Sequence, residues 1–182
     1  AWENGNNRLL YSDADNRKVT VLHDGFAQFP NNTWKGAGVA IPVFSLRSKN
    51  SFGVGEFADI RLLADWAQKT GLKLIQLLPV NDTMASFTWM DSYPYGAISA
   101  FALHPLYINL AKVAGKEYAA LLKPLAATQK ALNEGPVVDY EEVMRHKMPA
   151  LRELYQAMGE DCLDTDDFKQ FFRTNKHWLE SY

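Results

Sequence analysis

The side chains best suited to chemistry lie between positions 81 and 110, in a stretch that we call the aromatic loop. Aromatic residues are interleaved there with serines and a carboxylate: Phe87, Trp89, Asp91, Ser92, Tyr93, Tyr95, Ser99 and Phe101. Flat apolar rings beside hydroxyl groups suit a hexose, because a sugar needs stacking and hydrogen bonds together. The pattern therefore favours a sugar site, and the alternative is a hydrophobic plug over the end of a barrel.

The aromatic loop has two acidic residues, Asp82 and Asp91. Glycoside chemistry requires a close pair of carboxylates, with one as nucleophile or base and the other as acid. Both aspartates follow a predicted strand, at the end where barrel enzymes place their sites, so they could form such a pair. In the other interpretation they hydrogen-bond the loop backbone and substrate hydroxyls, and Asp82 braces the turn between Asn81 and Thr83.

A second motif, Gly53-x-Gly55-x-x-Ala58, loosely matches a dinucleotide-binding fingerprint and opens a predicted helix. The fingerprint needs its first glycine directly after the strand, whereas residues 45–52 intervene here. We therefore expect the glycines to let a loop approach the barrel mouth closely. A nucleotide-binding α/β domain is the rival hypothesis.

The composition argues against several classes of function. A net charge of −2 offers no basic surplus to a nucleic-acid binder, and no run of about 18 apolar residues marks a membrane span. The four histidines lie far apart and none pairs with Cys162 at ligand spacing, so we expect no metal ion. A single cysteine cannot form an internal disulfide, which is compatible with a cytoplasmic protein.

The aromatic loop follows a predicted β-α-β unit. The apolar run 38–44 is typical of a parallel strand covered on both faces. A helix of about 15 residues follows, with Ile60 on its apolar face and Asp59 facing away, and Gly71 is placed to end it. Residues 73–80 form a second buried strand, at the spacing of a crossover between parallel strands.

From about residue 111 the pattern is helical. We expect one helix broken near Pro124, an amphipathic helix over 140–158, and a third from Asp166 with Thr165 as its cap. Two strands joined by one helix cannot close an α/β sheet, and the chain stops within the last helical pattern. We therefore expect it to be a piece of a longer protein.

Several segments resemble, in order and at the right spacing, the opening of the catalytic barrel of the amylomaltase (4-α-glucanotransferase) family. The resemblance covers roughly residues 36–182 and is carried by Gly38–Leu46, Ser51–Phe57, Leu77–Thr83, Asp91–Tyr95, Ser99–Tyr107, Val138–Tyr140, Lys147 and Trp178–Glu180. It implies an α/β fold that is the N-terminal portion of a (β/α)8 barrel. Residues 35–110 would form the first β-α-β unit with the substrate loop, and residues 111–182 a helical insertion.

The N-terminal motif Trp2-Glu3-x-Gly5-x-Asn7-Arg8 resembles the closing motif of a starch-binding module. Such modules precede the barrel in the branch of plant cytosolic disproportionating enzymes, which the aromatic loop also resembles. The resemblance implies that residues 1–34 are the β tail of a module plus a linker, with glucan contacts at Trp2 and Asn7.

The activity implied by the resemblance is that of a retaining 4-α-glucanotransferase, which moves α-1,4-glucan units between maltooligosaccharides or to glycogen or a starch-like glucan. Tyr95 matches the tyrosine that stacks on the sugar beside the scissile bond, and Tyr93, Ser92 and Asp82 are further candidates for substrate contacts. The family's catalytic carboxylates follow later strands, so none falls in this chain. No cofactor is implied, nor any oligomeric state, and the alternative is a non-catalytic glucan-binding fragment.

Overall fold

The computed structural model describes residues 35–182. Within it, Ala37–Tyr182 form one compact unit. The expected starch-binding tail over residues 1–34, with Trp2 and Asn7, lies outside the described residues.

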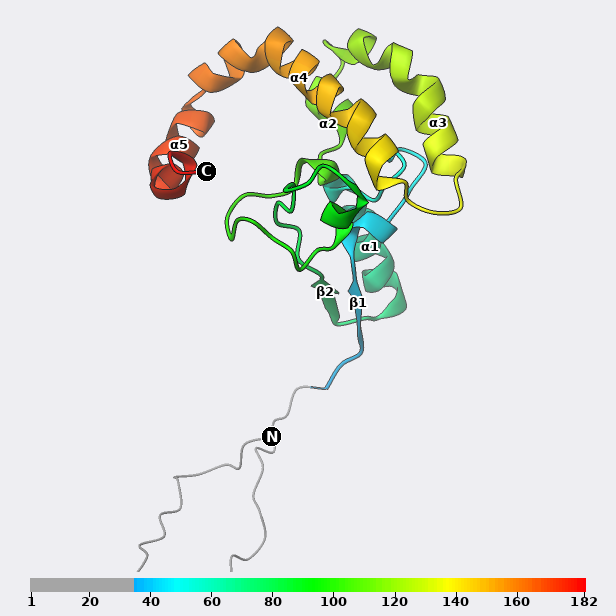
Figure 1. The fold of residues 1–182 in the computed structure, drawn as a ribbon. Coiled ribbons are helices and arrows are strands. Elements are labelled where there is room, and N and C mark those ends of the chain that lie inside the picture. The colour runs from blue at the N-terminus through cyan, green and yellow to red at the C-terminus, as the bar shows by residue number, and fades with distance from the viewer. Residues whose placement is uncertain (1–34) are drawn as a thin grey trace, which may run out of the picture. The chain divides into compact units, whose positions relative to one another are not determined.

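The unit begins with a parallel β-α-β arrangement (Figure 1). Strand β1 (Gly38–Ile41) pairs in parallel with β2 (Leu74–Leu77), and α1 (Phe57–Thr70) connects them. This confirms the predicted crossover. Strand β1 is shorter than predicted because Pro42, which has no N–H to donate, follows its end and begins a turn into the 3-10 helix η1 (Val43–Ser45).

The two strands are less buried than predicted. Their residues alternate between exposed and half-buried, so the expectation of strands covered on both faces is wrong for the described part of the chain. A sheet of two strands has too few neighbours to bury both of its faces.

Helix α1 has clear signals at both ends. Glu56 and Asp59 form a capping box at its start, in which the Asp59 carboxylate accepts a hydrogen bond from the Glu56 N–H at 2.8 Å. Asp59 also accepts from the Ser51 hydroxyl at 2.8 Å and is buried, so the prediction that it faces solvent is wrong. Gly71 ends the helix at φ 75°, as predicted.

The two ends of the aromatic segment 81–103 lie side by side and are hydrogen-bonded to each other. An isolated antiparallel bridge joins Asn81 to Leu103, and the His104 N–H donates to the Val80 carbonyl at 3.0 Å. Between these ends lies the short 3-10 helix η2 (Trp89–Ser92), and η3 (Pro105–Tyr107) follows.

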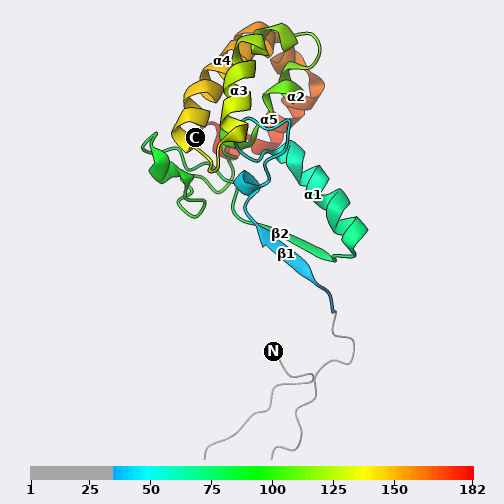
Figure 2. The same cartoon turned by 90° about the vertical axis from the view of Figure 1, so that its right-hand side faces the viewer.

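The remainder is helical, as predicted. The predicted break near Pro124 is confirmed because η4 is a 3-10 helix that changes to α3 directly after it, and the Thr165 side chain caps α5 by accepting from the Phe168 N–H at 3.2 Å. The elements are α2 (Leu110–Ala114), η4 (Ala119–Leu125), α3 (Ala126–Glu134), α4 (Tyr140–Asp164) and α5 (Asp166–Leu179) (Figures 1 and 2).

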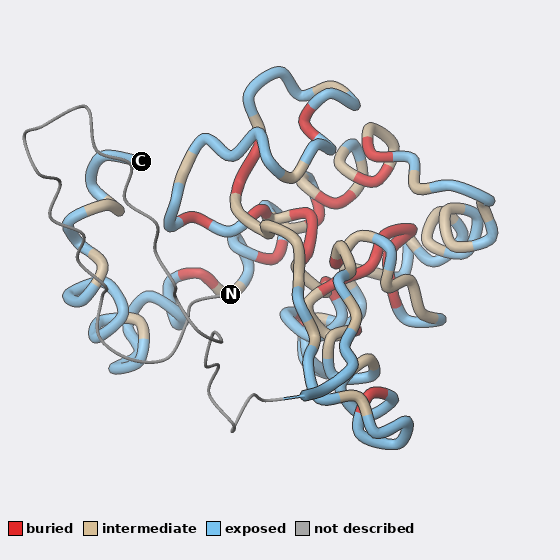
Figure 3. The backbone as a smooth tube through the Cα atoms, turned by 90° about the horizontal axis from the view of Figure 1, so that it is seen from below, coloured by how far each residue is buried: buried red, intermediate tan, exposed pale blue. Residues whose placement is uncertain are grey.

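The hydrophobic core joins the helical part to the loops that follow β1 and β2. Val43 and Val54 from the first loop pack with Leu106, Val143 and Leu154, and all five are buried. Figure 3 shows buried stretches, in red, on several segments of the unit, separated by exposed stretches in pale blue. The core therefore fixes α4 against the two loops that any site at this end of the strands would use.

Candidate functional site

Asp91 organises the tip of the aromatic loop. Its carboxylate accepts hydrogen bonds from the Ser86 N–H at 3.0 and 3.1 Å, from the Ser86 hydroxyl at 2.8 Å and from the Phe87 N–H at 2.6 Å. Burial acts to raise the pKa of Asp91, but these hydrogen bonds outweigh it and the pKa is lowered. The residue is therefore an ionised brace that uses its oxygens within the loop.

The brace holds a strained backbone. Phe87 has φ 58°, a left-handed conformation that side chains with a Cβ rarely adopt. Its N–H donates directly to Asp91, which offsets part of the cost of that conformation. Phe87 is 75% exposed in this conformation.

Asp82 occupies the base of the loop and is only 2% exposed. Its Oδ1 accepts from the Met84 N–H at 2.8 Å, and its Oδ2 accepts from the Tyr182 hydroxyl. Both loop carboxylates are thus buried and hydrogen-bonded, which agrees with the interpretation of Asp82 and Asp91 as braces. As the structure stands, neither presents an open carboxylate to a glycosidic bond.

Tyr93 and Tyr95 form an exposed aromatic pair. The two side chains are 63% and 60% exposed, and their ring centroids lie 5.6 Å apart at an interplanar angle of 49°. A hydrogen bond from the Gly96 N–H to the Tyr93 carbonyl, at 3.1 Å, makes the turn that brings them together. Rings this exposed do not plug the described part of the structure, and their faces are open to a ligand.

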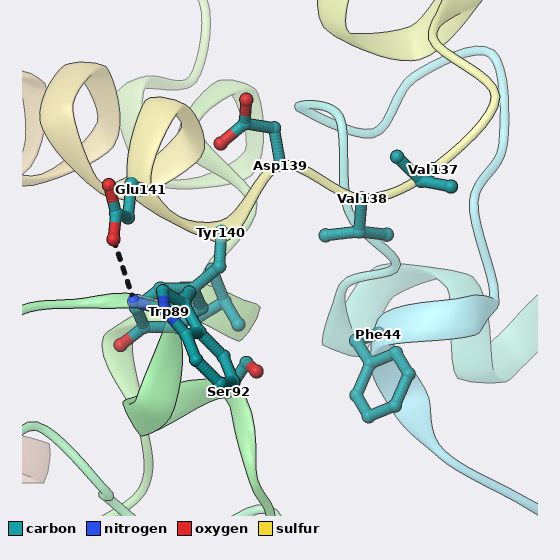
Figure 4. A pocket seen from close by; sticks show the side chains of 9 residues that line it. Phe44, Trp89, Ser92, Val137, Val138, Asp139, Tyr140 and Glu141 are labelled. Carbon is teal, nitrogen blue, oxygen red and sulfur yellow. Dashed lines mark hydrogen bonds between the residues drawn. The ribbon is translucent and has the colours of Figure 1, made fainter.

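Ser92, the neighbour of Tyr93 in the chain, lines a cavity of about 530 Å³ between η2 and the start of α4. Figure 4 shows Trp89 and Ser92 on one side of this cavity and Val138 on the other, and the Trp89 N–H donates to Glu141 Oε1 at 2.9 Å. The size is within the range of small-ligand sites. The lining residues are Phe44, Trp89, Ser92, Leu106, Val137, Val138, Asp139, Tyr140 and Glu141.

Tyr140, which lines this cavity, belongs to a buried hydrogen-bonded pair with His104 that the sequence analysis did not identify. His104 Nδ1 accepts from the Leu106 N–H at 3.0 Å, so the proton of a neutral imidazole sits on Nε2, which lies 3.0 Å from the Tyr140 hydroxyl. Burial lowers the pKa of His104 and keeps it neutral. The Tyr140 hydroxyl oxygen accepts a hydrogen bond from His104 Nε2–H, and its own O–H remains able to donate one. No spacing signal marks a pair that is 36 residues apart.

A second buried network lies at the start of α1. Lys147 Nζ donates to the Glu56 carboxylate and, at 2.6 Å, to the Leu106 carbonyl, and Asn109 donates to the same carboxylate. Burial raises the pKa of Glu56 and lowers that of Lys147. Both side chains are fully buried, so this ion pair fixes α4 to the loop before α1.

The glycine motif serves close packing. The Gly55 N–H donates to the Phe44 carbonyl at 2.9 Å, and a Cβ at Gly55 would lie 2.0 Å from the Val43 carbonyl oxygen. The loop thus approaches the turn after β1 closely, and the expectation that this approach lies at a barrel mouth stays a prediction.

Two further features concern the described residues as a whole. Residues 35–182 gather no group of three or more His, Cys, Asp or Glu side chains that could hold a metal ion. Over the same range, no helix has both the length and the apolar character needed to cross a bilayer.

The parallel β-α-β unit is the building block of α/β folds, and its second strand leads here into an exposed aromatic loop that two carboxylates brace. The family model described as 4-alpha-glucanotransferase matches residues 41–182. The chain belongs to this family.

Individual relatives carry the same name. The chain is 39% identical over 165 residues to the 4-alpha-glucanotransferase DPE2 of Oryza sativa subsp. japonica, covering 91% of this chain and 17% of that protein. It is 37% and 36% identical over 146 residues to the 4-alpha-glucanotransferases of Chlamydia caviae and Chlamydia pneumoniae, covering 80% of this chain and 27% of each. The chain thus spans less than a third of the length of these curated relatives.

Proposed function

We propose that the chain is the part of a 4-α-glucanotransferase that supplies an aromatic glucan-binding surface. The observation that carries this proposal is the exposed pair of Tyr93 and Tyr95 on a loop braced by Asp91. Stacking on such rings retains a sugar while its hydroxyls remain free for hydrogen bonds. Membership of the family supports the assignment.

We further propose how the chain fits the whole enzyme. Residues 35–110 would contribute the first β-α-β unit of a (β/α)8 barrel with its substrate loop, and residues 111–182 a helical insertion. Residues 1–34 would be the tail of a starch-binding module, in which Trp2 and Asn7 contact glucan. The family model and the parallel pairing of β1 with β2 support the barrel assignment.

The reaction of the whole enzyme would be a retaining transglycosylation. One carboxylate attacks the anomeric carbon of an α-1,4-glucan while an acid protonates the departing glycosidic oxygen. An acceptor hydroxyl then attacks the same carbon, gives its proton to the former acid, and displaces the carboxylate. Asp82 and Asp91 already bind loop donors, so we place the catalytic carboxylates outside this chain. Tyr95 would stack on the sugar beside the scissile bond, and the hydroxyls of Tyr93 and Ser92 would bind sugar oxygens.

The substrates follow from this chemistry. Maltooligosaccharides would serve as donors, and glycogen or a starch-like glucan would serve as acceptor, in the cytoplasm and without a cofactor. An aromatic surface that sheds water when it holds the sugar favours an acceptor sugar over water in the second step.

The experiment is a disproportionation assay with two samples. The 182-residue chain is incubated with maltotriose and glycogen, after circular dichroism shows that it is folded, and a longer version carrying the rest of the family's barrel is assayed beside it. We expect released glucose only from the longer version. Glucose released by the chain alone would contradict the placement of the catalytic carboxylates.

A second candidate function is glucan binding without catalysis. It is favoured by the bonded state of both loop carboxylates. The same assay separates the two functions, because a binding module would release no glucose in the longer version either, although both versions would bind maltotriose.

A further inference from the structure

The end of the chain contacts the base of the aromatic loop at two points. The Tyr182 hydroxyl donates a hydrogen bond to Asp82, and the Trp178 indole stacks on Phe101 with centroids 5.8 Å apart and planes 13° apart. We call these two contacts the α5 brace. Figure 1 shows the end of α5, in red, facing the loop, in green.

The residue held by this brace organises the loop. The Asp82 N–H donates to the Ala102 carbonyl at 2.9 Å, its carbonyl accepts from the Ile98 N–H at 2.8 Å, and its Oδ1 accepts from the Met84 N–H at 2.8 Å. Asp82 therefore ties together three points of the loop, on both sides of the tyrosine pair. Tyr182 is the donor to its remaining oxygen within the described residues.

Loss of this donor would change the loop. A buried carboxylate oxygen without a partner is unfavourable, so Asp82 would move toward water and loosen its bonds to Met84 and Ile98. Ile98 follows Tyr95 by three residues. The position of the exposed tyrosines is therefore coupled to a hydroxyl at the other end of the folded unit.

We propose that Tyr182 is a positioning residue for glucan binding, which acts through Asp82 to hold the aromatic loop in the conformation that presents Tyr93 and Tyr95. The inference rests on the proposed function, in which the tyrosine pair binds glucan. Tyr182 itself need not contact the sugar. Its effect on binding depends on the hydrogen bond from its hydroxyl to Asp82, which a change to Phe removes while the aromatic ring stays.

The test uses the 182-residue chain and the variants Tyr182→Phe, Asp82→Asn and the double variant. Tyr155→Phe is the matched control, because Tyr155 is an exposed tyrosine of α4 whose hydroxyl makes no hydrogen bond within the described residues. Two quantities are measured for each protein: the Kd for maltotriose by calorimetric titration, and the hydrogen-exchange rates of the Met84 and Ile98 amides.

We expect Tyr182→Phe to raise the Kd roughly three- to tenfold, the equivalent of one hydrogen bond, and to speed exchange at both amides. The thermal midpoint should stay within a few degrees of the parent, and Tyr155→Phe should change nothing. The double variant should bind about as well as Asp82→Asn alone, because both changes act on the one contact between Tyr182 and the Asp82 carboxylate.

Two results would overturn the inference: exchange rates in Tyr182→Phe that match the parent, or effects of the two single changes that multiply in the double variant. A parent chain that binds no maltotriose would refute the proposed function instead. The exchange rates would in that case still decide whether the α5 brace orders the loop.

Discussion

At the scale of single residues, the aromatic loop separates two roles. Buried aspartates hold the backbone, and exposed aromatic rings face solvent. The Asp91 carboxylate accepts hydrogen bonds from the N–H groups of Ser86 and Phe87 at the tip of the loop. The Asp82 carboxylate accepts one from the Met84 N–H at the base. Stacking surfaces are thus presented by backbone that is fixed before any ligand arrives, which lowers the entropy lost on binding.

Replacing Tyr95 with Ala should weaken glucan binding by roughly 1–3 kcal/mol, because the variant loses one aromatic stacking face. The measurement is the Kd for maltotriose in the chain and the transfer rate in the whole enzyme. Tyr155→Ala is the matched control, since that side chain is 61% exposed compared with 60% for Tyr95. Equal affinities of the two folded variants would refute the role given to Tyr95.

Replacing Asp91 with Asn should lower the free energy of unfolding by about 1–3 kcal/mol at neutral pH, because an amide accepts fewer of the donated hydrogen bonds. Urea denaturation measures the change, and Asp65→Asn, at an exposed position of α1, is the control. We expect little effect from the control.

The pH dependence of this difference has a definite sign. The folded pKa of Asp91 is lowered from 3.8, so its stabilising contribution is complete above that value and is lost as the pH falls through the folded pKa. The parent and Asp91→Asn should therefore converge in stability only below about pH 4. A difference that disappears already at pH 6 would show that the Asp91 charge is not the cause.

At the scale of elements, the pair of Glu56 and Lys147 joins the helical part to the β-α-β unit. The two residues are 91 positions apart, and each is fully buried. An ion pair in such surroundings is costly to form and more costly to break on one side.

Replacing Lys147 with Met should lower the free energy of unfolding by about 3–5 kcal/mol, because it leaves the Glu56 charge buried without its partner. Adding Glu56→Gln to the same chain should restore most of the loss, as judged by chemical denaturation. Lys130→Met is the control, since its pair with Glu134 spans 3.9 Å between exposed side chains and should contribute less than about 1 kcal/mol. A double variant as unstable as the single one would show that packing, and not charge, is responsible.

Local sequence signals predicted most of the elements. Gly71 ended its helix, Thr165 capped the last one, and Pro124 marked a break, because each of these depends on a few neighbouring residues. Asp59 was assigned to the wrong face, since helical periodicity says nothing about a carboxylate recruited as a cap. The strands are less buried than their apolar sequences predict. An apolar run does not specify how many other strands and helices pack against it in the fold.

The site was predictable only in part. The clustering of aromatic residues pointed to Tyr93 and Tyr95, and their exposure agrees with a binding surface. The contacts of Asp82 with Tyr182, of His104 with Tyr140 and of Glu56 with Lys147 join residues that are 36 to 100 positions apart, and a single sequence carries no pairing signal over such distances.

At the scale of the whole molecule, the chain is one compact unit over residues 37–182 and spans 17% to 27% of the length of the relatives compared above. Its core lies where loops meet the helical part, while both strands remain partly open. The proposed function places a glucan on the aromatic loop that follows β2, on exposed residues that the buried aspartates of the loop hold.

The bridge between Asn81 and Leu103 has a consequence for how this family can change over time. Because both ends of the intervening segment are pinned together, insertions at its tip leave the strand behind it undisturbed. The entropic cost of a longer flexible segment grows only with the logarithm of its length, by about 0.6 kcal/mol for each doubling. The segment can thus be exchanged or extended at its tip while β2 and the helical part stay unchanged.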